Sequence, residues 1–142
     1  MSSTQIISEK SKRIFNAKGS LRKLLDINAK NYSNFGEIYI TKIKYNKIKG
    51  WKKHKKIDSN IFLLSGRVLF VTVKKINNRF FFYEHFLSLV KNDYIFIPKN
   101  NFFAFYGLSK KEAVILNLAS FPHSKNETIE KKISYFNYKW KI

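Results

Sequence analysis

Cysteine is absent from the 142 residues of this chain. Its absence excludes disulfides, thiolate catalysis, and zinc or iron–sulfur centres held by cysteine. Histidine is scarce, with His54, His85 and His123 the three examples, so a histidine-rich metal site is hard to build. We therefore expect no metal centre.

Long apolar runs are also lacking. No segment approaches the ~20 apolar residues of a membrane-spanning helix. The opening stretch MSSTQIISEKSKR does not have the charged-then-apolar order of a signal peptide. These two absences predict a soluble cytoplasmic protein that does not contact a membrane.

Acidic residues are few. The chain has 9 Asp and Glu against 28 Lys and Arg, which gives a formal net charge of +19. Such an excess would ordinarily indicate a polyanionic partner such as nucleic acid. However, arginine, whose planar fork suits phosphate and guanine, occurs at positions 13, 22, 67 and 79 alone. An AT-rich coding sequence explains the lysine and asparagine excess equally well, so we expect no nucleic-acid partner.

Strand periodicity, in contrast, is abundant. Apolar residues alternate with a period of two between short turn-forming stretches, which is typical of half-buried strands. The segments that carry this pattern are GEIYITKIKY, RVLFVTVKK, RFFFYEHFLSL, DYIFIP, FFAFYGL and EAVILNLASF. RVLFVTVKK is apolar on both faces, as in the middle of a sandwich. Many short strands in a chain of this length predict one all-β domain, an antiparallel sandwich, barrel or jelly roll.

The two ends differ from this pattern. Residues 1–12 are polar enough to form an N-terminal arm, either frayed or added to a sheet as an edge strand, so residues 13–142 make the single domain. Residues 126–133 are expected to form a short helix. The closing aromatic residues are expected to pack back onto the sheet; they are Tyr135, Phe136, Tyr138 and Trp140.

A series of short motifs resembles a known family. The motifs are NAKGSLRKL, NFGEIYITKIKYNKIKGWKKHKK, LLSGRVLFVTV, IFIPKNNFFAFYGL, LASFPHSKNETI and the closing YKW. Over residues 12–142 the series resembles the sugar-nucleotide cupins related to dTDP-4-dehydrorhamnose 3,5-epimerase. It is more distantly similar to the dTDP-4-keto-6-deoxyhexose 3,4-ketoisomerases. GEIYIT followed by IKGW is the most specific part of the series.

The resemblance implies an all-β cupin jelly roll with a short helical and aromatic C-terminal tail, commonly a homodimer. Its barrel mouth would receive a nucleotide-linked 4-keto-deoxysugar. In such enzymes a histidine removes the acidic proton beside the keto group, a tyrosine returns a proton from the other face, and cations hold the diphosphate. Because the carbonyl acidifies the neighbouring carbons, the chemistry needs a base and an acid but no cofactor. The implied role is an epimerase or isomerase acting on a dTDP-4-keto-6-deoxyhexose in surface polysaccharide biosynthesis.

The catalytic residues that the resemblance implies are His54 and Lys52. Lys52 stands where the epimerases have their catalytic histidine, and His54 matches the second histidine of the closer relatives. Because the two positions are two residues apart in extended backbone, their side chains are expected to point to one face. Crowding by neighbouring lysines would leave Lys52 a neutral amine, able to act as a base or to form an imine. The alternatives are that Lys52 replaced the histidine after activity was lost, and that His54 is a surface residue.

Other family positions fall on different residue types. The histidine after the IP turn is Phe103 here, and the catalytic tyrosine falls near Leu116, so Tyr106 is the nearest spare phenol. The cationic positions of the family are kept as Lys18, Lys49 and Arg67, which we expect near the diphosphate. Two aromatic residues, Trp51 and Tyr39, are expected to line the mouth or to stack on the base.

Three hypotheses follow from the sequence. The leading one is an epimerase or isomerase of the family with altered catalytic residues. The second is a cupin that binds a sugar nucleotide but has lost the base and the acid. The third is a polyanion-binding module, which ranks last because the aromatic residues follow strand alternation and do not form an exposed platform among arginines.

Overall fold

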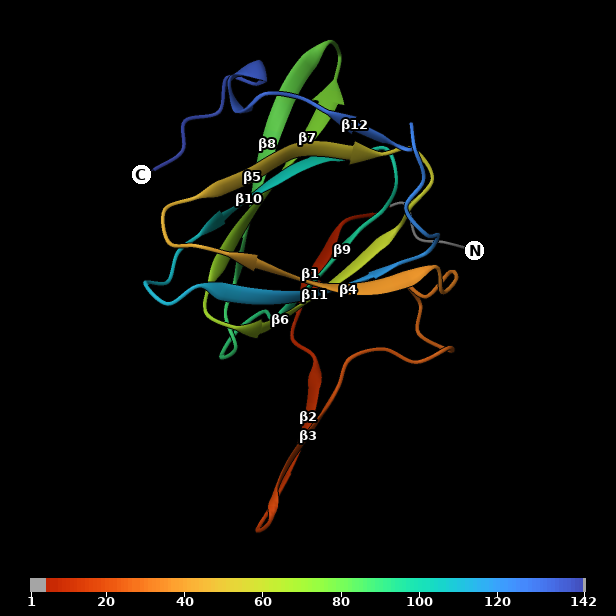
Figure 1. The fold of residues 1–142 in the computed structure, drawn as a ribbon, viewed down its shortest axis with the longest axis vertical. Coiled ribbons are helices and arrows are strands. Elements are labelled where there is room, and N and C mark those ends of the chain that lie inside the picture. Colours follow the sequence, from red (N-terminus) through yellow and green to blue (C-terminus); the bar gives the residue numbers. More distant parts are fainter. Residues whose placement is uncertain (1–4, 142) are drawn as a thin grey trace.

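The structure of the protein is a computed structural model that describes residues 5–141 (Figure 1). Its strands form two five-stranded sheets and a separate hairpin. The first sheet has the order β1 (Ile7–Glu9), β9 (Tyr94–Ile97), β6 (Ser59–Ser65), β11 (Ala113–Ala119) and β4 (Glu37–Ile43). The second has the order β12 (Thr128–Glu130), β5 (Ile48–His54), β10 (Phe102–Gly107), β7 (Val68–Ile76) and β8 (Arg79–Leu87). The hairpin consists of β2 (Lys12–Asn16) and β3 (Gly19–Lys23).

The two sheets face each other, and the predicted all-β cupin jelly roll is confirmed (Figure 1). Side chains that alternate along the strands fill the space between the sheets. Ile61 and Ile115 from the first sheet and Phe70 and Phe105 from the second belong to one buried cluster. Burial of each such side chain stabilises the fold by about 1.5–3 kcal/mol. No helix in the described part of the chain is long and apolar enough to cross a membrane.

The second sheet is covered on its outer face as well, as the apolar pattern of β7 predicts. Leu69 and Val71 point away from the space between the sheets and pack with the C-terminal tail. The tail covers Trp51 of β5, whose ring centroid lies 5.2 Å from that of Phe136 and 5.7 Å from that of Trp140. The expected packing of the closing aromatic residues onto the sheet is therefore present.

The prediction of a short helix over residues 126–133 is wrong. Residues Thr128–Glu130 form β12, which extends the second sheet by pairing antiparallel with β5. Helical structure in the described residues is confined to one 3₁₀ turn, Ile133–Tyr135. The backbone N–H and C=O groups of this segment bond to the free edge of β5. This pairing outweighs the local propensity of the segment to form a helix.

The N-terminal segment takes the form of an edge strand from residue 7 onwards. β1 pairs antiparallel with β9, which adds residues of the predicted arm to the first sheet. Residues 1–4 of that arm lie outside the described residues. The hairpin β2–β3 that follows stands away from the sheets (Figure 1).

A buried aspartate fixes the base of this hairpin. Asp93 Oδ2 lies 3.1 Å from Arg22 Nη2 and 3.3 Å from Arg13 Nη2. The Ser11 amide and hydroxyl donate to the same carboxylate at 2.6 and 2.8 Å. Arg22 also donates to the carbonyl oxygen of Leu63 in β6. The hairpin is thus attached to the domain through charge-assisted hydrogen bonds at its base.

Candidate functional site

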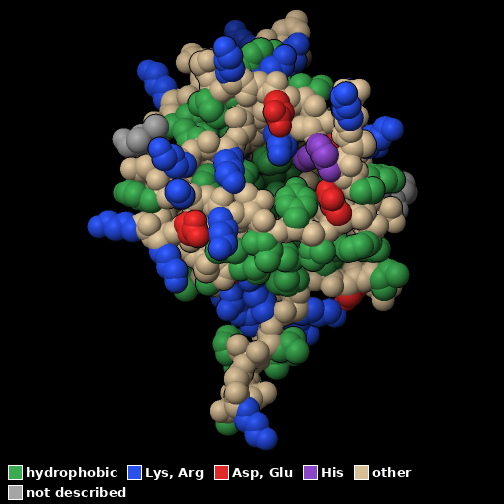
Figure 2. Space-filling model, in the orientation of Figure 1, with side chains coloured by type: hydrophobic (Ala, Val, Ile, Leu, Met, Phe, Trp, Pro, Cys, Tyr) green, Lys and Arg blue, Asp and Glu red, His purple; other side chains and the backbone are tan. Residues whose placement is uncertain are grey.

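A cavity of about 410 Å³ opens between the two sheets. Figure 2 shows the surface hollowed there, with lysine side chains on the rim. Polar and charged residues that line the cavity are Tyr39, Thr41, Lys49, Lys52, His54, Asn117, Glu130 and Lys131. The others are Gly50, Trp51, Ile61, Phe103, Phe105 and Ile115. One part of the wall is therefore apolar, and polar and ionisable groups occupy much of the rest.

His54 is held in the cavity wall by a carboxylate. The Nδ1 atom of His54 lies 2.9 Å from Oε2 and 3.2 Å from Oε1 of Glu127. The hydroxyl of Thr128 donates to Glu127 Oε2 at 2.9 Å. Both partners are buried, with 8% of the His54 side chain and 2% of the Glu127 side chain exposed. The imidazole is therefore fixed in orientation, with its other nitrogen, Nε2, on the side away from Glu127.

Glu127 is charged in this arrangement. Burial alone raises the pKa of Glu127, but hydrogen bonds from His54 and Thr128 and the electrostatic interaction with His54 outweigh it, so the pKa lies below its ordinary value. The backbone N–H groups of Lys56 and Ile57 also donate to Oε1, each at 3.3 Å. Because an ionised carboxylate only accepts hydrogen bonds, it selects the His54 tautomer that carries its proton on Nδ1. In the neutral imidazole, Nε2 is then free to accept a proton.

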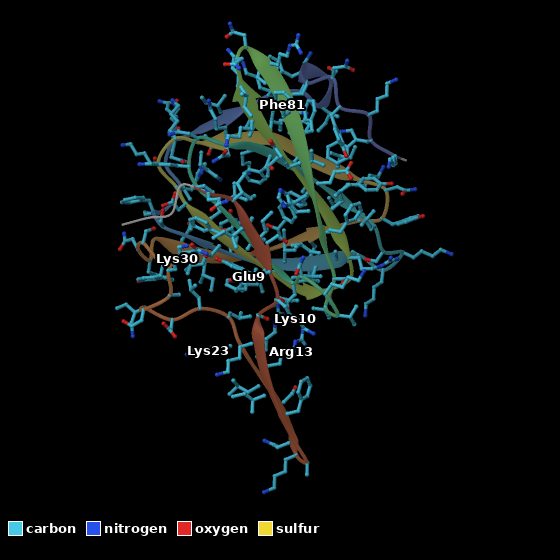
Figure 3. The ribbon with its side chains drawn as sticks, turned by 180° about the vertical axis from the view of Figure 1, so that it is seen from behind. Glu9, Lys10, Arg13, Lys23, Lys30 and Phe81 are labelled. Atoms are coloured by element: carbon cyan, nitrogen blue, oxygen red, sulfur yellow. The ribbon has the colours of Figure 1, made fainter. Side chains whose placement is uncertain are left out.

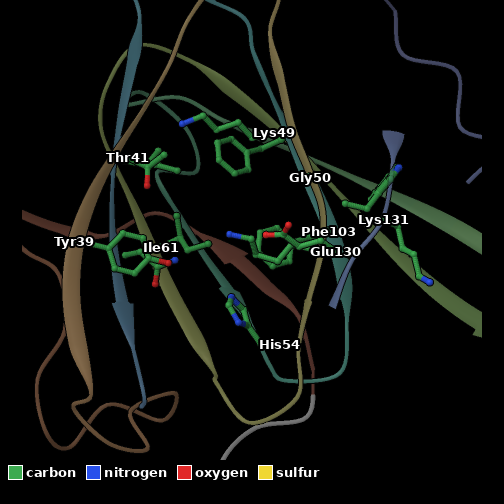
Figure 4. A pocket seen from close by; sticks show the side chains of 14 residues that line it. Tyr39, Thr41, Lys49, Gly50, His54, Ile61, Phe103, Glu130 and Lys131 are labelled. Atoms are coloured by element: carbon green, nitrogen blue, oxygen red, sulfur yellow. The ribbon is translucent and has the colours of Figure 1, made fainter. Parts of the chain in front are cut away.

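Tyr39 lies on the opposite wall of the cavity, on β4, whereas His54 ends β5 (Figure 4). Burial raises the pKa of the Tyr39 phenol, the charge of Glu37 raises it further, and the Asn117 side chain opposes both. The phenol is therefore a proton donor at neutral pH. Asn117 Oδ1 is buried without a hydrogen-bond partner among the described residues, which leaves an acceptor for a hydroxyl group of a ligand.

Lys52 and Lys49 line the cavity from β5, and Lys49 Nζ donates to the carbonyl oxygen of Lys42 at 2.9 Å. A glycine between them allows β5 to approach β10 closely. A Cβ atom at Gly50 would lie 2.5 Å from the Cβ of Ala104, and the φ of Gly50 is +133°, so no larger residue fits. Lys52 and His54 both line the cavity, as their two-residue spacing predicts.

Two of the predicted cations lie elsewhere in the chain. Lys18 is exposed in the turn of the hairpin β2–β3, where its amide hydrogen-bonds to Asn16 Oδ1. Arg67 is exposed in the turn between β6 and β7, where its amide donates to Ser109 Oγ. Neither residue is among those that line the cavity. The structure therefore does not bring Lys18 or Arg67 to the cavity of its own chain.

Trp51 borders the cavity, but its indole is turned the other way. The ring is fully buried in the aromatic cluster under the C-terminal tail, and Nε1 donates to the carbonyl oxygen of Ile133 at 3.1 Å. The expectation that this ring stacks on a bound base is wrong, because adjacent residues of a strand point to opposite faces and Lys52 takes the inner one. Tyr106, the spare phenol, also packs in this outer cluster.

Glu127 is the functional candidate that the sequence analysis missed. It is separated from His54 by 73 residues and lies just before β12, in the segment expected to be helical. The available signal was its rarity, as one of 9 acidic residues in a basic chain. His123 is exposed, and His85 bonds to Thr72 at 3.1 Å, so the other two histidines lie outside the cavity. Among residues 5–141, no three His, Asp or Glu side chains gather closely enough to hold a metal ion.

Solved structures share the fold of this chain. A dTDP sugar isomerase from Desulfovibrio desulfuricans G20 superposes with a TM-score of 0.85 at 19% identity, over 95% of this chain and 90% of that chain. A dTDP-4-dehydrorhamnose 3,5-epimerase from Sulfolobus tokodaii superposes with a TM-score of 0.78 at 15% identity, over 96% and 82%. A sugar 3,4-ketoisomerase from Thermoanaerobacterium thermosaccharolyticum, in complex with TDP, gives 0.68 at 19% identity, over 87% and 86%.

These neighbours are the kinds of protein that the motif series resembles. At identities of 15–19% the similarity establishes the fold. No model of a known protein family and no curated protein matches the sequence.

Proposed function

We propose that the protein binds a nucleotide-linked 4-keto-6-deoxyhexose in the cavity between its sheets and catalyses an epimerisation or isomerisation beside the keto group. The observation that carries the proposal is the buried His54–Glu127 pair on the cavity wall, 2.9 Å between Nδ1 and Oε2. A histidine whose tautomer and orientation are fixed by a buried carboxylate is arranged for general-base catalysis. The fold shared with dTDP-sugar isomerases and epimerases supports this substrate class.

The reaction begins with proton removal from a carbon next to the carbonyl. His54 Nε2 takes that proton, and the electron pair moves onto the carbonyl oxygen to give an enolate. Lys52 acts in this proposal as an ammonium group that stabilises the developing oxyanion from the cavity wall, in place of the neutral base expected from the sequence, because His54 supplies the base. Tyr39 returns a proton from the opposite wall, which inverts the carbon if the same carbon is protonated. The C=O bond re-forms in the same step, and proton exchange with water returns His54 to the neutral state and Tyr39 to the phenol.

The remaining cavity residues suit the rest of the ligand. Lys49 supplies positive charge for the diphosphate, whereas the Lys131 Nζ is turned to the Tyr135 ring, 4.9 Å from its centroid. Phe103, which stands at a family histidine position, contributes to the apolar wall with Ile61 and Ile115, and this wall fits the C6 methyl group of a 6-deoxy sugar. Asn117 Oδ1 lacks a partner among residues 5–141 and accepts from a sugar hydroxyl.

A homodimer accounts for the position of Lys18. The hairpin that carries it exposes apolar side chains, with Phe15 71% and Leu21 58% exposed, and a second copy would cover them. On β4, Ile38 and Ile40 add 53% and 56% exposed apolar side chains to the surface. In such a dimer, Lys18 contacts the diphosphate in the cavity of the partner. We further propose that the protein works in the cytoplasm, in the biosynthesis of a surface polysaccharide.

The test of the enzymatic proposal is incubation with dTDP-4-keto-6-deoxyglucose in deuterated water. We expect deuterium at C3 or C5 and a new isomer by NMR, with both lost in His54→Asn. Absence of exchange with every keto sugar tried would refute catalysis. Saturable binding of the sugar nucleotide in that case would favour the non-catalytic binding cupin, and loss of binding as well would refute the sugar-nucleotide pocket.

The dimer proposal has a separate test in mixed variants. Lys18→Ala and His54→Asn each inactivate a homodimer if both residues serve the site. When the two proteins are mixed and exchange subunits, heterodimers regain one intact cavity only if Lys18 acts in the partner's site. Recovery of about a quarter of wild-type activity is the expected value for an equal, random mixture with one live site in each heterodimer. No recovery after verified subunit exchange would refute the contribution of Lys18 across the dimer.

A further inference from the structure

A second cavity, of about 550 Å³, lies at the base of the hairpin β2–β3. Its walls come from β1, the start of β2, the end of β3 and the segment of residues 24–31, with Tyr94 of β9 at the floor. Tyr94 packs on Phe62 on the outer face of the first sheet, whereas Ile61 lines the cavity between the sheets. The two cavities therefore lie on opposite faces of the first sheet and share no lining residue.

Positive charge gathers around this second cavity. Four lysines from three separate segments line it, namely Lys10, Lys12, Lys23 and Lys30, together with two carboxylates, Glu9 and Asp26. Figure 3 shows Glu9, Lys10, Lys23 and Lys30 near one another at the hairpin base. The ammonium group of Lys23 lies 2.7 Å from Asp26 Oδ2, which pairs these two residues.

In the described part of the chain the other three lysines form no salt bridge, and they outnumber Glu9, the unpaired carboxylate among the lining residues. Among residues 5–141, Lys10, Lys12 and Lys30 have no carboxylate within salt-bridge distance. Ammonium groups held around one cavity repel each other, and this repulsion is relieved when an anion enters. The network of Arg22 and Asp93 fixes the base of the hairpin, whose backbone carries Lys12 and Lys23 into the wall of this cavity.

The floor of the cavity is a buried hydrogen-bond network in which one acceptor atom, Asn31 Oδ1, lacks a donor among the described residues. Asn31, 7% exposed, lines the cavity, and its side-chain amide donates to the Tyr94 hydroxyl at 3.3 Å. Tyr94 in turn donates to Asn60 Oδ1, and the Asn60 amide donates to the Asn31 carbonyl oxygen at 3.1 Å. Asn31 Oδ1 has no hydrogen-bond partner among the described residues. A buried acceptor without a donor indicates that a hydroxyl or water belongs there.

We propose that this second cavity is a binding site for a small phosphate ester that carries free hydroxyl groups, such as a sugar phosphate or a nucleotide. The phosphate is held by Lys10, Lys12 and Lys30, and a ligand hydroxyl donates to Asn31 Oδ1. Phosphate is favoured because three cations surround one space of small-molecule size, and a hydroxyl is favoured because the orphan group on the floor is an acceptor. The site is independent of the proposed reaction, since it lies across the sheet from the first cavity.

The experiment is a titration of the full chain with glucose 1-phosphate and, separately, with inorganic phosphate, by calorimetry at low ionic strength. We expect saturable binding of both probes and tighter binding of the ester. The lysine double variant Lys10→Ser/Lys30→Ser is expected to weaken both at least about tenfold, the scale of one or two lost charge-assisted hydrogen bonds. In NMR spectra of ¹⁵N-labelled protein, the side-chain amide resonances of Asn31 are expected to shift on binding.

A matched control separates this site from the general positive charge of the protein. Lys110→Ser/Lys111→Ser removes the same charge from the exposed turn between β10 and β11, which lines neither cavity, and is expected to leave binding within about twofold. Equal weakening by both double variants, or no saturable binding of either probe, would overturn the proposal. Asn31→Ala is expected to remove the preference for the ester while leaving phosphate binding, and an unchanged preference would overturn the assignment of the hydroxyl.

Discussion

The Nδ1 atom of His54 and the Oε2 atom of Glu127 lie 2.9 Å apart, although 73 residues separate them in the chain. His54 closes β5 and Glu127 immediately precedes β12, so the antiparallel pairing of these two strands brings them together. The same pairing puts Thr128 beside His54 in register. The orientation of the candidate base therefore depends on a strand pair at the edge of the second sheet.

Replacement of Glu127 by glutamine is expected to slow the reaction. The glutamine side chain is nearly isosteric but neutral, so it neither selects the Nδ1–H tautomer of His54 nor stabilises the imidazolium that forms when His54 takes a proton. We expect kcat for deuterium exchange to fall about 10- to 100-fold with KM little changed. Glu130→Gln is the control, because it removes a carboxylate from the same cavity on a residue paired with Lys52. Equal effects of the two variants would contradict the positioning role of Glu127.

Glu127 is also expected to make the folded state sensitive to acid. Its pKa in the folded protein lies below the ordinary value of 4.5. The unfolded chain therefore binds a proton first as the pH falls, and the stabilisation from this group is present above pH 4.5 and is lost as the pH falls through the folded-state pKa. The check is the free energy of unfolding by urea between about pH 7 and about pH 3, a range that spans this titration. The Glu127→Gln protein should lose less stability than the wild type over that interval.

Tyr39→Phe is expected to separate proton removal from proton return. His54 still exchanges the proton beside the carbonyl in this variant, so deuterium uptake with retention of configuration continues. Formation of the inverted product is expected to fall about 10²- to 10⁴-fold, because the donor on the opposite wall is missing. NMR of the reaction in deuterated water measures both quantities at once. A parallel loss of exchange and inversion would contradict the assignment of Tyr39 as the acid.

Asp93→Asn is expected to destabilise the fold strongly. Asp93 is fully buried, accepts hydrogen bonds from Ser11 and Arg13 and is ion-paired with Arg22, so its neutral replacement leaves two guanidinium groups without their counter-charge. The expected loss in free energy of unfolding is about 3–5 kcal/mol, the scale for removal of one partner of a buried ion pair. Asp26→Asn removes the carboxylate of the exposed pair with Lys23 and is expected to change little. Urea denaturation of both variants makes the comparison.

His85 is expected to weaken the folded state as the pH falls below neutrality. Burial lowers the pKa of His85 below its ordinary value of 6.5, so the unfolded chain takes up the proton first. The unfolding free energy therefore decreases as the pH falls through 6.5, until the folded-state pKa is reached. His85→Gln removes this titration, and its stability should vary less between about pH 7.5 and about pH 5. A wild-type curve that matched the variant over that range would contradict the prediction.

Much of the fold was predictable because alternation with a period of two is a local property. RVLFVTVKK became β7, buried on both faces, and EAVILNLASF contains β11, whose Ile115 and Asn117 point inward. The segment of residues 126–133 was not predictable in this way. A strand that is held only by a distant edge has no periodic signal of its own, and its local propensity was compatible with a helix.

In the candidate site, too, features set by local sequence were predictable and features set by strand pairing were not. Sequence by itself determined that the protein is an all-β domain without cysteine chemistry, and it identified Lys52 and His54 as neighbours on one face of a strand, because side-chain direction in a strand follows residue number. Only the tertiary structure decided that Glu127 orients His54, that Tyr39 faces it from the other wall, and that the ring of Trp51 is buried outside the cavity. These relationships join strands far apart in the chain, so they depend on sheet order and register, which no local pattern encodes.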